Sequence, residues 1–218
     1  MNEIIKKIVD IGLLPVFFND DVETSKEVVR ACYEGGAEVV EFTNRGPQAF
    51  DVFRELVRWK REELPDLILG AGTILDAQTA SLYINSGANF IVSPILNLEI
   101  LRVCNRRGVP CIPGCMTPTE ISLAKEGGAE LIKLFPAKVV GADFIKTIRG
   151  PLPHVMLMPS GGVDVTKENI HEWIRAGASA LNIGTKLIRK DLIREKRFDE
   201  IKKLVEQCIL WIKDARTR

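Results

Sequence analysis

The stretch GGAELIKLFPAK, Gly127–Lys138, combines the main fold signal of this chain with an unexpected charge. Leu131, Ile132 and Leu134 form an apolar run that is typical of a buried strand in a parallel sheet. Lys133 lies in the middle of this run, although lysine is among the residues that are least often fully buried. An isolated buried ammonium is costly, so this lysine needs either a partner or a chemical role.

The stretch is one of four related segments, each with Gly-Ala, one polar or small residue, and then an apolar run. They are GGAEVVEF from Gly35, SGANFIVS from Ser86, GGAELIKL from Gly127 and AGASALNI from Ala176. The Gly-Ala glycines are Gly36, Gly87, Gly128 and Gly177. Each glycine is predicted to cap the C-terminus of a helix with a positive φ, and the apolar run after it to form a buried parallel strand.

Four further apolar runs indicate additional strands. They are LLPVFF from Leu13, LILGAG from Leu67, VPCIPG from Val109 and VMLMPSGG from Val155. Amphipathic patterns predict helices over Val22–Tyr33, Pro47–Glu62, Ala77–Asn85, Leu98–Arg107 and Thr117–Lys125. The alternation predicts an α/β fold, a (β/α)8 TIM barrel with Asn2–Ile11 as an extra N-terminal helix, and a doubly wound open sheet is the competing architecture. Because no linker-like stretch is visible, residues 1–218 are expected to form a single (β/α)8 barrel domain.

The repeat aligns one position in each of the four segments, five residues after the Gly-Ala glycine. These positions hold Glu41, Val92, Lys133 and Asn182. Alternate strands of a barrel contribute to one interior layer, so the four side chains are expected to face one another. A buried Glu–Lys ion pair rarely stabilises a core relative to apolar residues, which disfavours a purely structural role. The pattern indicates an active site near the C-terminal ends of the strands.

Lys133 and Glu41 form the candidate catalytic pair. Burial lowers the pKa of a lysine because it disfavours the charged form, and the neutral amine can then form a Schiff base with a carbonyl carbon. The imine withdraws electrons and allows a nearby carbon–carbon bond to break or form. A carboxylate beside it can move the protons. This chemistry requires no cofactor, and none is expected.

Two loops after the last two predicted strands favour phosphate binding. MPSGGV begins at Met158 and NIGTKLI begins at Asn182. Barrels often bind phosphate with these two loops, where glycine amides approach the anion. Glycines also end strands for geometric reasons, but here they occur at both expected places. The candidate phosphate-binding residues are Ser160, Gly161, Gly162, Gly184 and Thr185.

Arg45 lies just past the strand that carries Glu41. A guanidinium at this rim can hold a substrate carboxylate with two hydrogen bonds, although most arginines are solvated surface charges. Thr73, in GAGT, and Pro94, in VSP, end two neighbouring strands at the same rim.

The composition disfavours several other functions. The formal net charge of +1, without a basic block, argues against nucleic-acid binding and against a polybasic membrane role. Met1–Asp10 does not resemble a signal peptide, and no run approaches the ~20 apolar residues of a membrane span, so we expect a cytoplasmic protein. The five cysteines are expected to be reduced thiols, and neither they nor the two histidines indicate a metal site.

The ordered motifs resemble those of the 2-keto-3-deoxy-6-phosphogluconate (KDPG) aldolase family, which includes 4-hydroxy-2-oxoglutarate (KHG) aldolases. They are VVEFTNR, GAGT, IVSP, IPGCMTPTE, LIKLFPA, PSGGV and NIGT. The resemblance implies a homotrimeric class I aldolase with Lys133 as the Schiff-base lysine and Glu41 as the general acid/base. It places Arg45 and Thr73 at the substrate carboxylate. Pro94 and Phe135 would line the pocket.

Three positions depart from the usual family pattern. Asn44 replaces an apolar residue beside the substrate, Ser160 replaces a threonine, and Thr185 replaces a serine. The expected reaction is cleavage of KDPG to pyruvate and glyceraldehyde 3-phosphate, with KHG as a further substrate that gives pyruvate and glyoxylate. The 6-phosphogalactonate epimer is an alternative substrate, although the retained Arg45 favours the gluconate type. A phosphate-binding isomerase or synthase, or a non-catalytic sugar-phosphate-binding barrel, is a further alternative, and a non-catalytic protein would not need Lys133.

Overall fold

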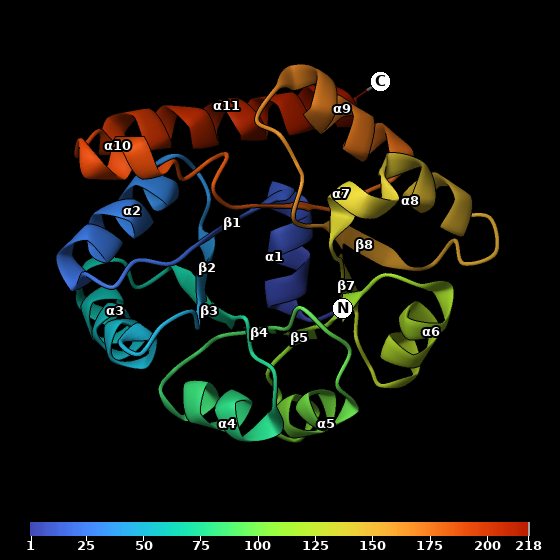
Figure 1. The fold of residues 1–218 in the computed structure, drawn as a ribbon, viewed down its shortest axis with the longest axis horizontal. Helices are drawn as coiled ribbons and strands as arrows, with labels where there is room; N and C mark the ends of the chain where they lie inside the picture. Colours follow the sequence, from blue (N-terminus) through green and yellow to red (C-terminus); the bar gives the residue numbers. More distant parts are fainter. Residues whose placement is uncertain (218) are drawn as a thin grey trace.

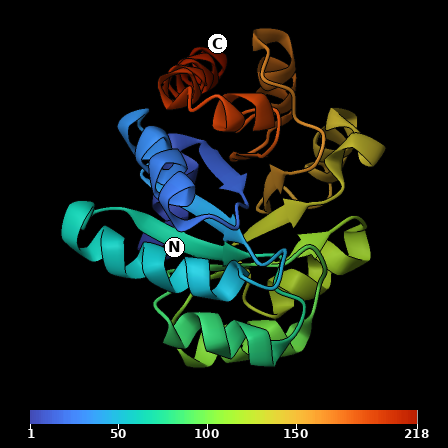
Figure 2. The ribbon, with the colours of Figure 1, turned by 60° about the vertical axis from the view of Figure 1, so that its left-hand side comes forward.

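The computed structural model describes residues 1–217 as an α/β fold in which a curled parallel sheet is surrounded by helices (Figures 1 and 2). The strands are β1 (Leu13–Phe17), β2 (Val39–Thr43), β3 (Ile68–Gly72), β4 (Ile91–Val92), β5 (Cys111–Ile112), β6 (Gly114–Cys115), β7 (Leu131–Leu134), β8 (Met156–Pro159) and β9 (Leu181–Ile183).

Helices alternate with these strands along the chain. They are α1 (Glu3–Ile11), α2 (Val22–Glu34), α3 (Ala49–Glu63), α4 (Ala77–Asn85), α5 (Leu98–Arg106), α6 (Pro118–Glu126), α7 (Ala137–Val140), α8 (Ala142–Ile148), α9 (Lys167–Ala176), α10 (Lys190–Arg194) and α11 (Phe198–Arg216). Among residues 1–217, no helix has the length and apolar character that a bilayer crossing requires.

The strands form two hydrogen-bonded sheets in which all pairings are parallel. The first sheet has the order β5-β4-β3-β2-β1-β9, and the second has the order β6-β7-β8. A parallel bridge between Ser160 and Asn182 links the end of β8 to β9. At the other junction, β5 and β6 are separated by Pro113 alone. The predicted fifth strand is therefore divided at a residue that has no backbone N–H to donate to a ladder.

Side chains that point into the curled sheet form an inner cluster at the N-terminal ends of the strands. Its members include Val39, Phe90, Leu131 and Ala180, each of which comes two residues before a member of the predicted layer. Helix α1 completes this cluster with Ile5 and Ile8, which are buried, and in the view of Figure 1 α1 appears at the centre, with strands around it. Because this apolar cluster fills the N-terminal ends of the strands, the polar side chains of the interior lie at the C-terminal ends.

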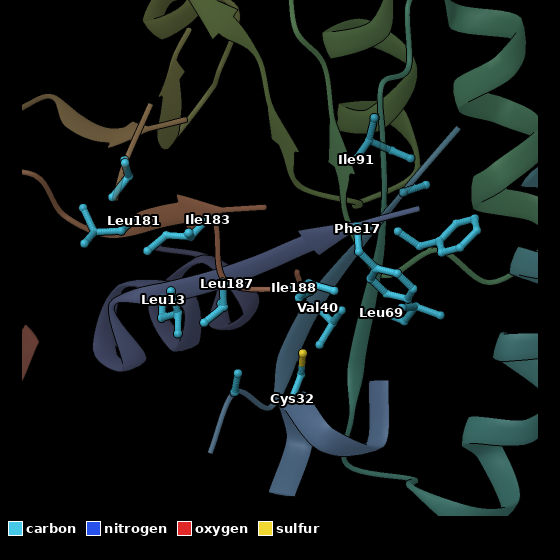
Figure 3. Close-up of a cluster of buried hydrophobic side chains, with 14 of the residues drawn as sticks. Leu13, Phe17, Cys32, Val40, Leu69, Ile91, Leu181, Ile183, Leu187 and Ile188 are labelled. Carbon is cyan, nitrogen blue, oxygen red and sulfur yellow. The ribbon is translucent and has the colours of Figure 1, made fainter. Parts of the chain in front are cut away.

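An outer cluster fills the space between the strands and the surrounding helices. Figure 3 shows part of it, where Cys32 of α2 lies near Val40 of β2, and Leu13 of β1 lies near Leu187. The long helix α11 packs against both α9 and α2 and so covers the region of β1 and β9. All five cysteines are buried free thiols.

The bounds predicted for the first six helices agree with the structure to within two residues, whereas no bounds were predicted for α7 to α11. Helix α6, for example, begins where Thr117 and Glu120 form a reciprocal capping box and Pro118 takes the first helical position. The four Gly-Ala glycines all have positive φ, between 92° and 106°, as predicted. Only Gly177 is itself a helix C-cap, however, and the caps of α2, α4 and α6 lie one residue earlier.

Candidate active site

Lys133 and Glu41 lie side by side inside the curled sheet. Lys133 is on β7, Glu41 is on β2, and Lys133 Nζ is 3.8 Å from Glu41 Oε1. The Lys133 side chain is 7% exposed and that of Glu41 is fully buried. Burial lowers the pKa of Lys133 from its ordinary value of 10.5, the Glu41 carboxylate opposes this shift, and the charge of Arg45 adds to it. The expected meeting of the two side chains is confirmed, in an environment that favours a neutral amine.

Glu41 is held by one of its two carboxylate oxygens. Asn182 Nδ2 donates a 2.9 Å hydrogen bond to Glu41 Oε2. Glu41 Oε1 is buried and accepts no hydrogen bond from residues 1–217. The charged group nearest to this second oxygen is the Lys133 ammonium. A buried oxygen without a donor is unusual in a stable core, and it is well suited to exchange protons with a bound molecule.

A cavity of about 490 Å³ opens above the pair at the C-terminal ends of β1, β2, β7, β8 and β9. It gathers eight of the predicted site residues. These are Arg45, Lys133, Phe135, Ser160, Gly161, Gly162, Gly184 and Thr185. The Lys133 ammonium lies 5.5 Å from the centre of the Phe135 ring, within the range of a cation–π contact. Glu41 lies beneath the cavity and reaches it through Lys133 and Asn182.

The far end of the cavity is formed by the two glycine-containing loops. Gly161 and Gly162 have φ values of 74° and 124°, which side chains rarely tolerate. A side chain at Gly162 would also overlap Lys138. These loops therefore expose bare backbone to the cavity, as an anion site requires.

Two lysines, which sequence reasoning did not assign to the site, complete this far end. Lys186 and Lys190 both line the cavity. Lys186 Nζ lies 3.2 Å from a carboxylate oxygen of Asp164. Lys190, in contrast, has no carboxylate within 4.0 Å among residues 1–217. Its charge is therefore available to an anion in the cavity.

Arg45 and Thr73 are linked at the rim, but only Arg45 lines the cavity. Arg45 Nε donates a 3.2 Å hydrogen bond to Thr73 Oγ1. Thr73 has a φ of 59°, an uncommon conformation for a β-branched residue. Pro94 does not line the cavity either, and its backbone packs closely against Gly114. Thr73 thus adjoins the cavity through its contact with Arg45, and Pro94 lies outside the cavity wall.

Asn44 is directed away from the cavity. Its Oδ1 accepts a 3.0 Å hydrogen bond from the hydroxyl of Tyr83 on α4, and it is absent from the cavity wall. The polar residue at this position is therefore satisfied by a helix. The resemblance placed Asn44 beside the substrate, but Asn44 does not line the cavity.

The sequence reasoning did not predict several residues that line the cavity, and these residues differ in whether a sequence pattern could have identified them. Thr43 lies two residues after Glu41 on β2, so strand alternation alone could have found it. Asn182 occupied the predicted layer but received no role. Phe18 follows the end of β1 and Lys190 begins α10, and their entry into the cavity depends on loop paths that no local pattern specifies.

Known proteins resemble this chain in sequence and in fold. The 2-dehydro-3-deoxy-phosphogluconate aldolase of Haemophilus influenzae is 32% identical over 212 residues, which cover 97% of each chain. A KDPG aldolase structure from Legionella pneumophila, with pyruvate captured as a covalent carbinolamine intermediate, is 26% identical. Its TM-score is 0.81 over 89% of this chain and 92% of that one. A structure described as native KDPGal is 25% identical, with a TM-score of 0.84 over 94% and 96% of the two chains.

These likenesses, together with the buried lysine at the strand ends, define the class of the protein as an aldolase, a carbon–carbon lyase. A family model for KDPG and KHG aldolase matches residues 4–204. The chain belongs to the KDPG and KHG aldolase family, which confirms the resemblance found in its motifs.

Proposed function

We propose that this protein is a class I aldolase that cleaves KDPG to pyruvate and glyceraldehyde 3-phosphate. The observation that carries the proposal is the buried Lys133 ammonium, whose pKa is lowered by burial, 3.8 Å from the Glu41 carboxylate under a cavity. An apolar core does not need this pair, whereas Schiff-base chemistry does. The Legionella relative with covalently captured pyruvate supports the same assignment.

In the proposed reaction, the neutral Lys133 amine attacks the C2 carbonyl of KDPG. The resulting carbinolamine loses water to give a protonated Schiff base. Glu41 then accepts the proton of the C4 hydroxyl, the C3–C4 bond breaks, and glyceraldehyde 3-phosphate departs. The bonding electrons remain as an enamine on Lys133. Glu41 returns a proton to C3, and hydrolysis of the imine releases pyruvate and restores both side chains.

The cavity has complementary charge at two places for a substrate with two anionic ends. Arg45 is proposed to bind the carboxylate beside the reacting carbonyl, with Thr73 positioning the guanidinium. Phe135 would bound this end of the pocket, whereas Pro94 lies outside the cavity wall. The phosphate is proposed to bind where Gly161, Gly162, Gly184 and Thr185 meet, with Lys190 as a free cation. The Ser160 hydroxyl is already engaged with Asn182, so it is less suited to phosphate.

The galactonate epimer is the second candidate substrate, favoured by the likeness to the KDPGal structure. The two epimers differ in configuration at C4, beside the bond that breaks, so both can use the Lys133–Glu41 chemistry. KHG lacks the phosphate and tests the far end of the cavity. A panel of KDPG, its galactonate epimer and KHG, compared by kcat/KM, distinguishes these specificities.

A second proposal concerns the closure of the two sheets. We propose that the two sheets close into a single (β/α)8 barrel domain, with α1 as an extra N-terminal helix. The sheets are joined on one side by the bridge between Ser160 and Asn182, and on the other side by the continuous chain from β5 through Pro113 to β6. A cytoplasmic homotrimer is proposed from the family. Sedimentation equilibrium tests the trimer, and a mass of one or two protomers would contradict it.

Trapping with pyruvate and borohydride, read by intact mass, tests the function. One reduced pyruvyl group per chain is expected. A non-catalytic sugar-phosphate protein, or an isomerase or synthase that needs no Schiff base, would remain unmodified, and that result would overturn the proposal.

A further inference from the structure

The side chain of Asn182 lies between the proposed base and the strand next to it. Asn182 Nδ2 donates to Glu41 Oε2 at 2.9 Å and to the carbonyl oxygen of Leu14 at 3.1 Å. Its Oδ1 accepts a 2.5 Å hydrogen bond from the Ser160 hydroxyl. Asn182 is 1% exposed and Ser160 is 5% exposed, so water competes little with this network.

The strand register explains why the amide can reach Glu41. Strand β1 lies between β9 and β2, with Leu14 opposite Asn182 and Val16 opposite Glu41. The Asn182 side chain therefore spans β1 on the inner face of the sheet. It meets the carboxylate from the side away from β3.

The network allows one orientation of the amide. The Leu14 carbonyl and the Glu41 carboxylate are both acceptors, and both face the same amide nitrogen. Exchanging the oxygen and nitrogen of Asn182 would set Oδ1 against two acceptors and NH₂ against the Ser160 hydroxyl. The donor role of Nδ2 toward Glu41 thus follows from its surroundings.

We propose that Asn182 is a positioning residue, oriented by Ser160, that holds Glu41 by Oε2 and leaves Oε1 to move protons beside Lys133. The proposal rests on the aldolase function. A neutral amide suits this task because it fixes the carboxylate without placing a second cation next to Lys133. Free rotation of the carboxylate would otherwise separate Oε1 from the substrate carbon.

Replacing Asn182 separates this role from Schiff-base formation. Asn182→Leu keeps a similar size and removes the donor. We expect it to form the borohydride-trapped pyruvyl adduct with the yield of the unmodified enzyme at saturating pyruvate. Its exchange of pyruvate methyl protons in D₂O, followed by proton NMR, should fall about 10- to 100-fold, because small misplacements of a catalytic group have effects of this size. The kcat for cleavage should fall with it, while KM changes little.

A double variant shows whether Asn182 acts through Glu41. Asn182→Leu combined with Glu41→Gln should exchange protons no more slowly than Glu41→Gln alone, because residues that act as one unit are not additive. A purely structural role would make the two losses multiply and would reduce trapping in parallel. Exchange at the unmodified rate in Asn182→Leu, or multiplying losses, would overturn the proposal.

Ser160 provides a second test that leaves the amide in place, should Asn182→Leu fail to fold. Ser160→Ala removes the hydroxyl that orients Asn182, and it should lower the exchange rate several-fold. Ser160→Thr keeps a hydroxyl and should restore the rate, whereas equal rates in the alanine and unmodified proteins would contradict the proposal. Absence of trapping in the unmodified enzyme would instead refute the aldolase function itself.

Discussion

Gly72 packs so closely against the Glu41 carboxylate that position 72 has no room for a side chain. A Cβ on Gly72 would overlap Glu41 Oε1 and lie 2.6 Å from the carboxyl carbon. Gly72 is on β3, next to β2, so its bare backbone makes the space that the free carboxylate oxygen occupies. The glycine in GAGT is thus a requirement of the proposed base, and GAGT does more than end a strand.

Gly72→Ala is therefore expected to disable Glu41 without touching Lys133. The added methyl group must displace the carboxylate, because β3 is fixed by pairing on both sides. Cleavage activity should fall about 100-fold, the scale of a 1 Å misplacement, and overpacking should cost about 1–3 kcal/mol of stability. Turnover and thermal unfolding measure the two effects. Full activity in a folded Gly72→Ala protein would show that Oε1 is not needed.

Glu41→Gln keeps the shape of the side chain and removes its titration. We expect kcat to fall about 10²–10⁴-fold, the usual contribution of general acid–base catalysis. Pyruvate methyl exchange should slow to a similar degree, and the borohydride adduct should still form. The protein should fold, because an amide is easier to bury than a carboxylate. If turnover and exchange both stay at the unmodified rates, Glu41 is a structural partner and another group moves the proton.

The pH dependence of trapping reports on Lys133. Only the neutral amine attacks pyruvate, so the initial trapping rate should rise with pH and reach half its maximum below pH 10.5, the ordinary lysine pKa, because burial lowers that of Lys133. Glu41 raises the pKa of Lys133, so Glu41→Gln should move this midpoint to lower pH, whatever it does to the maximum rate. A midpoint that moves upward would contradict the geometry.

Lys133→Ala is the control for the site of modification. It should form no adduct, although Lys138 remains four residues after the strand that holds Lys133. Peptide mapping of the unmodified protein should place the pyruvyl group on Lys133 alone. An adduct in Lys133→Ala would assign the Schiff base to another lysine.

Lys190→Ala tests the phosphate end of the cavity. A hydrogen bond to a charged group contributes about 1.5–3 kcal/mol, so KM for KDPG should rise about tenfold or more, with a weaker effect on KHG. Lys186→Ala is the matched comparison and should have a smaller effect, because Lys186 is already paired with Asp164. Equal changes on KDPG and KHG would argue against phosphate binding here. Gly162→Asp would be a poorer test of phosphate binding than Lys190→Ala. Its side chain would overlap Lys138, and the φ of 124° at this position strains any residue other than glycine.

The internal repeat was enough to predict the core of the site from the sequence. It aligned Lys133 with Glu41, and the layering of alternate strands in a barrel then indicated that the two side chains share one interior layer. Local rules predicted the helix start at Thr117 and the positive φ of Gly128. The helix start and the glycine conformation depend on only a few neighbouring residues.

The other contacts of the site could not be predicted from the sequence, because they depend on distances between strands and on the paths of loops. Asn182 and Glu41 are far apart in sequence, and their hydrogen bond exists because β1 lies between β9 and β2 in a specific register. The turn of Asn44 toward Tyr83 and the entry of Lys190 into the cavity likewise depend on packing between distant segments. Local patterns predict which face a side chain takes, but only the folded sheet sets which partner lies within hydrogen-bonding distance, because a hydrogen bond is lost within a few tenths of an ångström.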